Sequence, residues 1–231
     1  MSQTVRSEEM RRKLVARIPR WYVPWVHLLG PSLVGIPIVV YALARVRAPR
    51  AWELATVPLV LVLSNFLEWL LHRDVLHHSR FPFGFAFVRH TPQHHGAFDG
   101  SGLAIREAKE LKLVLLPAFG VLAMFLGAIA PGLVVAALVS ANVGALWVAT
   151  TVGYVLAYEW FHLSYHLPED SLVGRLPPVR VLRRHHAAHH TPELMQRANF
   201  NVTVPLWDWL LGTMAPAASA GAAAPQRSDA P

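Results

Sequence analysis

The hydrophobic positions of the chain fall into four long apolar stretches, and the polar segments between and around them hold nearly all of the charged residues. The stretches cover about residues 26–44, 54–71, 111–130 and 133–158. Each is close to the ~20 residues that a helix needs to cross a ~30 Å hydrocarbon layer. Because so little polar sequence is left to cover them in water, the pattern predicts four transmembrane helices and not the buried helices of a soluble domain.

The composition agrees with a membrane protein. Of the 231 residues, 54% are hydrophobic and only 15% are charged, which is too apolar for an ordinary soluble domain. The first stretch follows a basic segment of about twenty-five residues and has no A-x-A site after it, so we expect a membrane anchor and not a cleaved signal peptide. The chain has no cysteine, which excludes disulfides and thiolate metal sites.

The positive charges predict how the helices are oriented. Lysine and arginine concentrate in the N-terminal segment, in the polar stretch 72–112 and in the C-terminal region, which the positive-inside rule places in the cytoplasm. A tight turn predicted at Pro131 and Gly132 also requires that the segments before the third helix and after the fourth lie on one side. We expect a basic cytoplasmic segment over 1–25 and a disordered, low-complexity tail over 215–231.

The basic character of the chain, with a pI near 10.4, does not indicate nucleic acid. The basic residues flank the apolar stretches and no nucleic-acid motif is present. Anionic lipid headgroups are the more economical partners for these charges.

Twelve of the thirteen histidines lie in four clusters: HRDVLHH from His72, HTPQHH from His90, HLSYH from His162 and HHAAHH from His185. Imidazoles three or four residues apart share a helix face and can converge on one cation. Neutral imidazole favours a transition metal over magnesium or calcium. Since only a fold can bring distant clusters together, the pattern predicts a metal centre with enough ligands for two ions. The lone His27 is expected to be a hydrogen-bonded core residue.

Two acidic residues precede the first and third clusters, in EWLLH from Glu68 and EWFH from Glu159. Each lies on the helix face of the histidine that follows it, His72 or His162, and could accept the proton of the ring nitrogen that does not bind metal. The alternative is an acid at headgroup level beside a tryptophan. Both interpretations stay open for Glu68, and the metal site is favoured for Glu159. The similar segments also suggest two half-sites, from either an internal repeat or two hairpins of similar hydropathy.

These clusters, in this order and followed by NFNVTVPLWDWLLGT from Asn199, resemble the fatty acid hydroxylase and sterol desaturase superfamily of membrane di-iron proteins. The resemblance covers about residues 70–213. It implies an all-α integral membrane protein with about four transmembrane helices and a cytoplasmic helical cap that carries the clusters. A fatty acid hydroxylase-like membrane catalytic domain would then span 26–214.

The family's ligand pattern, carried over residue by residue, implies ten metal ligands: His72, His77, His90, His94, His95, His162, His166, His186, His189 and His190. His78 and His185 match no ligand position and are expected, with Glu68 and Glu159, to support the ligands. Asp208 could anchor the last cluster by hydrogen bonding or act as a local cap, and the structural role is favoured.

The chain departs from the family at two places. The closing motif of the family often reads Asn-aromatic-Gly, whereas Asn201 follows Phe200 here, so the local turn is expected to differ. The short N-terminal segment cannot hold the b-type cytochrome domain that some members carry. The resemblance therefore implies a separate electron donor, either a b-type cytochrome or a ferredoxin with its reductase.

The function implied is a membrane di-iron oxidoreductase that uses O2 to hydroxylate an unactivated C–H bond of a fatty acyl or related lipid. Zinc can replace the two irons on purification, because imidazole-rich sites bind it more tightly than Fe(II). A desaturase, or an oxidase of sterol, carotenoid or ether lipids, is the alternative within the superfamily. A metal transporter or sensor is the alternative outside enzymes, although transporters place their ligands near the bilayer midplane. We expect a bacterial inner-membrane location, with the active site and both termini in the cytoplasm.

Overall fold

The computed structural model describes residues 2–99 and 102–216, which form helices and connecting segments with no strand among them. The four longest helices are α2 (Pro24–Arg45), α4 (Thr56–Leu71), α7 (Ala118–Leu138) and α8 (Ala141–Tyr165). The shorter elements are α1 (Gln3–Ala16), α3 (Ala51–Leu54), the π-helices η1 (His72–Leu76) and η2 (Arg89–His95), α5 (Gly84–Val88), the 3-10 helix η3 (Ala108–Glu110), α6 (Leu111–Val114), α9 (Pro177–His189) and α10 (Leu206–Leu210).

Four helical segments are long and apolar enough to cross a membrane: Pro24–Arg45, Ala51–Leu76, Ala118–Leu138 and Ala141–Tyr165. At most a third of each apolar window is buried inside the protein. Their outward faces expose large apolar side chains, such as Leu59 at 68% and Leu138 at 80%. Side chains of this kind require a hydrocarbon surround. The predicted all-α membrane fold is confirmed.

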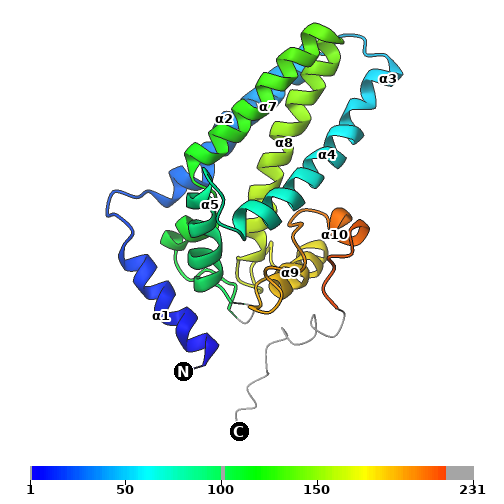
Figure 1. Ribbon diagram of the computed structural model, residues 1–231. Coiled ribbons are helices and arrows are strands. Elements are labelled where there is room, and N and C mark those ends of the chain that lie inside the picture. Colours follow the sequence, from blue (N-terminus) through cyan, green and yellow to red (C-terminus); the bar gives the residue numbers. More distant parts are fainter. Residues whose placement is uncertain (1, 100–101, 217–231) are drawn as a thin grey trace.

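Helix α8 lies at the centre of the bundle and packs against α2, α4 and α7 (Figure 1). Its Val152 and Leu156 form an apolar cluster with Val121 and Phe125 of α7. Helix α2 approaches this cluster at Gly35, where an added Cβ would lie 2.8 Å from the Phe125 ring. Small residues are what allow membrane helices to pack this closely, so Gly35 sets the separation of α2 from its neighbours.

The hairpin between α7 and α8 turns at Val139 and Ser140, so the turn predicted at Pro131 and Gly132 is wrong in position. Pro131 lies inside α7, as membrane helices tolerate when neighbouring groups satisfy the freed backbone. Gly132 serves close packing and not a turn, because its carbonyl oxygen lies 2.5 Å from where a Cβ on Gly144 would stand. The hydropathy pattern placed both helices too early in the sequence, because residues 111–117 are apolar but precede α7.

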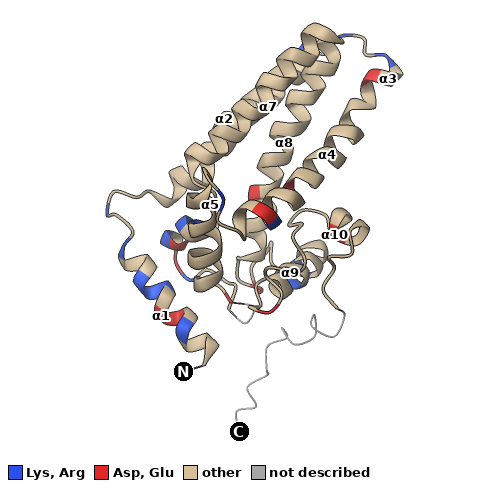
Figure 2. Cartoon of the chain, in the orientation of Figure 1, with Lys and Arg blue, Asp and Glu red and all other residues tan. Residues whose placement is uncertain are grey.

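The four histidine clusters lie at one end of the bundle, where α5, α9 and α10 form a cap with α1 beside it (Figure 1). Charged residues concentrate at this end, and a smaller set lies at α3 on the opposite end (Figure 2). The segments before α7 and after α8 therefore lie on one side, as the hairpin predicted, although the turn between these helices is at Val139 and Ser140. The cytoplasmic orientation of this end stays a prediction from the charge pattern.

The close approach of α7 and α8 predicts a position-specific effect of adding one methyl group. In Gly144→Ala the new Cβ would lie 2.7 Å from the backbone Cα of Ala136, and such overpacking costs about 1–3 kcal/mol. The matched control is Gly153→Ala on the same helix, where nothing lies within 4 Å. Thermal unfolding in detergent should show a lower Tm for Gly144→Ala and an unchanged or higher Tm for Gly153→Ala. Equal Tm values would contradict the close contact.

Candidate metal centre

Ten histidines converge in two groups of five at the cap end of the bundle. In each group, one possible ligand atom per residue lies within 4.8 Å of all the others. The first group is His72, His77, His90, His95 and His189, and the second group is His94, His162, His166, His186 and His190. All ten side chains belong to residues at most 8% exposed. These are the ten residues predicted as ligands, and the structure brings all of them together.

Two π-helices explain how the first group forms. His72 and His77 are five residues apart, as are His90 and His95, a spacing that an α-helix would place about 140° apart around its axis. Both pairs lie along π-helical turns, η1 and η2, whose i to i+5 hydrogen bonds bring this spacing onto neighbouring turns. His94, four residues after His90, joins the other group instead. The expectation that residues four apart share one cation is therefore wrong for this cluster.

The two groups adjoin and interlock. Residues adjacent on a helix point in different directions, so the pairs His94–His95 and His189–His190 each supply one ring to each group. The His95 and His190 rings, from different groups, stack with centroids 4.1 Å apart. The first group takes four histidines from the first half of the chain and the second group takes four from the second half, with one exchanged member each. The arrangement therefore fits one dinuclear site better than two separate ones.

Backbone carbonyls fix the proton on five of these rings. In the first group, Nδ1 of His72 and His189 donates to the oxygens of Phe200 and Ala198, at 2.5 and 2.8 Å. In the second group, Nδ1 of His94, His166 and His190 donates to the oxygens of Leu113, Leu103 and Phe98, at 2.9, 2.8 and 2.5 Å. A carbonyl oxygen can only accept, so Nδ1 carries the hydrogen and Nε2 is left with a lone pair.

The Nε2 atoms converge within each group. The Nε2 atom of His186 lies 3.2 Å from Nε2 of His166 and 3.0 Å from Nε2 of His190, yet a neutral ring has at most one hydrogen there to donate. In the first group, Nε2 of His72 lies 2.8 Å from Nε2 of His90. A cation among these nitrogens gives every lone pair a partner. The donor set, all imidazole nitrogen, therefore fits transition-metal ions such as iron or zinc.

The electrostatics of the cap favour the metal-binding form of these rings. Burial removes the water that would solvate a charged imidazole, and neighbouring imidazoles add to the effect. Together they hold the pKa of His90, His94, His95, His186, His189 and His190 well below the ordinary value. The rings are consequently neutral near pH 7, as metal ligation requires.

These pKa shifts predict that the metal-free protein loses stability in acid. Below about pH 6.5 histidines of the unfolded chain take up protons that the buried rings do not, so unfolding becomes more favourable as the pH falls. Each fully buried ring costs about 2 kcal/mol at pH 5. The Tm of chelator-treated protein, measured from pH 7.5 to 5.0, should fall progressively below about pH 6.5. The variant His78→Gln, at an exposed position, should fall in parallel, and a flat profile would contradict neutral burial.

Glu68 supports the site, but not through His72. Its carboxylate accepts hydrogen bonds from the backbone N–H groups of Val202 and Thr203, from the Thr203 hydroxyl at 2.6 Å and from the Tyr154 hydroxyl. Asn65 joins this buried network by donating to Tyr154 and Thr203 at 3.0 and 3.1 Å. The network ties α4 and α8 to the segment 198–204, whose carbonyls orient His72 and His189. Sequence proximity could not show this, because the segment returns from more than 130 residues away.

Asp208 anchors the same segment from the other side. It is fully buried and accepts from the N–H groups of Phe200 and Asn201 at 2.9 and 2.7 Å. It also accepts from the Thr213 hydroxyl at 2.7 Å, and Nε2 of His185, in the last cluster, lies 3.3 Å from its Oδ2. The local structural role of Asp208 is thus visible in the backbone N–H groups that it accepts from, whereas its contact with His185 is a proximity and not a hydrogen bond. His78 is exposed and its Nδ1 bonds the carbonyl oxygen of Arg73, so it contacts neither group.

The unusual closing motif is accommodated by its two asparagines. Asn199 adopts the left-handed conformation at φ 58°, which asparagine tolerates better than most residues. Asn201 is not left-handed, and its side chain accepts from the N–H groups of Trp207 and Asp208 at 3.1 and 3.2 Å. The Asn201 side chain thus accepts two backbone hydrogen bonds at the position where the resemblance led us to expect glycine.

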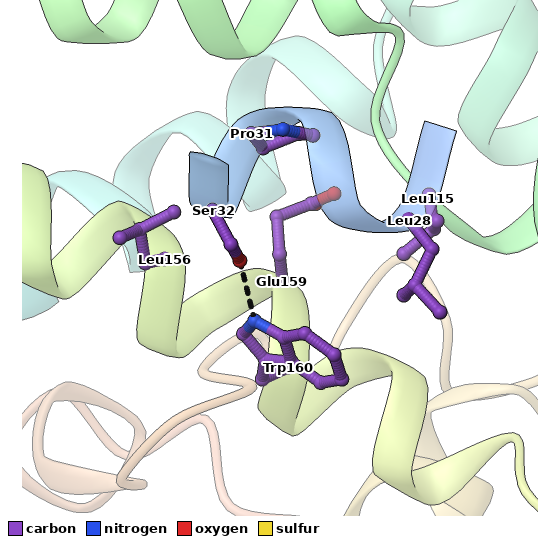
Figure 3. Close-up of a pocket in the computed structure, with 7 residues that line it drawn as sticks. All are labelled: Leu28, Pro31, Ser32, Leu115, Leu156, Glu159 and Trp160. Carbon is purple, nitrogen blue, oxygen red and sulfur yellow. Dashed lines mark hydrogen bonds between the residues drawn. The ribbon is translucent and has the colours of Figure 1, made fainter. Parts of the chain in front are cut away.

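Glu159 does not form the expected bond to His162 in the described part of the chain. Its carboxylate accepts from the N–H of Leu116 at 3.3 Å, because the segment after α6 crosses α8 at this level. The side chain lines a small pocket between α2 and α8, shown in Figure 3 beside the Trp160–Ser32 hydrogen bond of 3.0 Å. His27, as expected, is a hydrogen-bonded residue outside both groups, with Leu116 as one partner.

The anchoring role of Asp208 predicts that Asp208→Asn weakens metal binding. An asparagine amide keeps one acceptor oxygen and presents an NH2 group to backbone donors, so the segment that orients His72 and His189 should shift. Loss of such an outer contact typically lowers metal affinity 10–100-fold. Metal per chain and its dissociation constant can be measured by Zn(II) titration of chelator-treated protein. Glu193→Gln, at an exposed position, is the control, and equal affinities for the two variants would contradict this role.

Comparison with known proteins gives one match. Residues 57–213, more than half of the chain, match the family model described as fatty acid hydroxylase, and the chain belongs to this family. No curated protein and no solved structure matches it. The matched segment contains all ten converging histidines, together with Glu68 and Asp208. The protein is an integral membrane oxidoreductase with a candidate dinuclear metal centre.

Proposed function

We propose that this protein is a di-iron monooxygenase that hydroxylates an unactivated C–H bond of a membrane lipid, with O2 as co-substrate and electrons from a separate donor. The observation that carries the proposal is the pair of adjoining groups of five buried, neutral imidazoles, in a chain of the fatty acid hydroxylase family. The overall reaction converts one C–H bond, O2, two electrons and two protons into a C–OH bond and water.

The protein's own residues position and protect the centre. Bound iron would supply the oxygen chemistry that no side chain provides. The ten imidazoles would hold the two ions, and the carbonyls of residues 98, 103, 113, 198 and 200 hold five of those rings in the ligating tautomer. The almost complete burial of the ligands excludes bulk water, which protects an oxidising site from side reactions.

The surroundings of the centre support an apolar substrate. The ligands lie at the end of spans whose outer faces are apolar. An open apolar groove lies between α4 and α10, lined by Leu59, Val62, Leu63, Phe66 and Trp207. The groove adjoins Trp69, whose ring contacts that of Phe66 and meets Phe200 edge-on beside the first group. We propose that an acyl or related chain approaches the centre along this side of the bundle.

The same centre could perform desaturation, in which the substrate loses two hydrogens and gains no oxygen. A transporter is disfavoured, because the ligands lie at the cap end of the bundle and not midway along the spans. We place the centre on the cytoplasmic side of a bacterial inner membrane, where a b-type cytochrome or ferredoxin can deliver electrons.

Lipid mass spectrometry on cells that express the protein tests the function. Wild type should produce lipids heavier by one oxygen, whereas His94→Ala should produce none above background because it removes a ligand of the second group. His78→Ala is the matched control and should keep the wild-type product. A wild-type product lighter by two hydrogens would change the reaction to desaturation. Identical lipid profiles for wild type and His94→Ala, with altered cellular metal content, would favour transport instead.

A further inference from the structure

Helix α1 contacts the cap through a buried side chain, Arg11, in addition to an exposed Glu8–Arg106 ion pair and the apolar packing of Leu14. Arg11 is only 3% exposed, although the sequence around it is a basic segment expected to face lipid headgroups. Its Nε donates to Oε1 of Glu110 at 2.7 Å, and Nη2 donates to the carbonyl oxygen of Ala104 at 2.7 Å and to Glu110 Oε2. The guanidinium carbon also lies 4.7 Å from the centre of the Phe98 ring.

These contact points all lie on the segment that orients the second group of histidines. Phe98 accepts from His190, and its N–H donates to the carbonyl of His94 at 2.9 Å. Ala104 stands between Leu103, which accepts from Nδ1 of His166, and Ile105, whose N–H donates to the His166 carbonyl at 2.8 Å. Arg11 therefore binds the carbonyl of Ala104, and the two residues that flank Ala104 both form hydrogen bonds with His166.

The first group of histidines is oriented by a different backbone segment. The carbonyls that orient His72 and His189 belong to the segment 198–204, which Glu68 and Asp208 hold. The contacts of Arg11 described above are all on the 98–110 side of the cap. The two groups thus adjoin through their rings but rest on different backbone scaffolds.

We propose that Arg11 is a positioning residue that acts through Phe98, Ala104 and Glu110 to set the metal affinity of the second group, so that α1 clamps one of the two metal sites selectively. The inference rests on the dinuclear centre of the proposed function. A merely structural role for Arg11 would destabilise the cap as a whole and affect both groups alike. Selectivity between the sites is therefore the property to measure.

Anaerobic titration of the chelator-treated full-length protein with Fe(II), with bound iron measured per chain, tests the clamp. Wild type should bind two Fe(II). Arg11→Met should bind one with wild-type affinity and the second at least about tenfold more weakly, the lower range for loss of a contact behind the ligands. Arg12→Met is the matched control, because it removes the same charge from an exposed position of the same helix, and it should behave as wild type.

Two histidine backgrounds assign the weakened site. With the first group disabled by His77→Ala, Arg11→Met should weaken the Fe(II) that remains, and with the second group disabled by His162→Ala it should leave the remaining affinity unchanged. If Arg11→Met does not fold, Arg11→Lys replaces it, since an ammonium cannot reproduce the planar fork that reaches both Glu110 and Ala104. Equal weakening of both sites, or of neither, overturns the clamp. A wild type that binds fewer than two Fe(II) overturns the dinuclear centre itself.

Discussion

The placement of one proton on each of five imidazole rings is the constraint on which the centre depends. Backbone carbonyls hold that proton on Nδ1, so the Nε2 lone pairs face inward in each group. Burial then removes water as an alternative partner for them. This arrangement fits an occupant that accepts several lone pairs at once, which is what a transition-metal cation does. The chemistry of the family becomes possible because these carbonyls are fixed in space.

Most of the rest of the fold serves to fix those carbonyls. The first group depends on the segment 198–204, which Glu68, Tyr154 and Asn65 tie to the spans α4 and α8 and which Asp208 ties to α10. The second group depends on the carbonyls of Phe98, Leu103 and Leu113, and α1 contacts the same region at Phe98, Ala104 and Glu110. The spans supply the rigid base, since close contacts at Gly35, Gly132 and Gly144 set the distances between α2, α7 and α8.

The division of support has a consequence for the dinuclear oxidase proposed above. Each group has its own scaffold, yet the pair His94–His95 on η2 and the pair His189–His190 at the end of α9 each supply one ring to each group. Displacement of either scaffold would therefore alter the angle between the groups as well as the affinity of one of them. A reaction that requires both ions places a stronger demand on such rigidity than a single structural metal would, because catalytic groups must be held in their productive geometry before the substrate arrives.

The sequence by itself determined the membrane class, the number of spans and the family, and through the family's motif pattern the ten converging histidines. Hydropathy, residue type and motif order are properties of the residues themselves. Tertiary structure decided the rest. His94 belongs to the second group because of the π-helical turn of η2, and the α7–α8 turn lies at Val139 and Ser140. Glu68 bonds the segment 198–204, and Arg11 is buried against Glu110. Each of these outcomes depends on helix geometry or on contacts between segments that lie far apart in the chain, and neither a helix-face rule nor a hydropathy pattern contains that information.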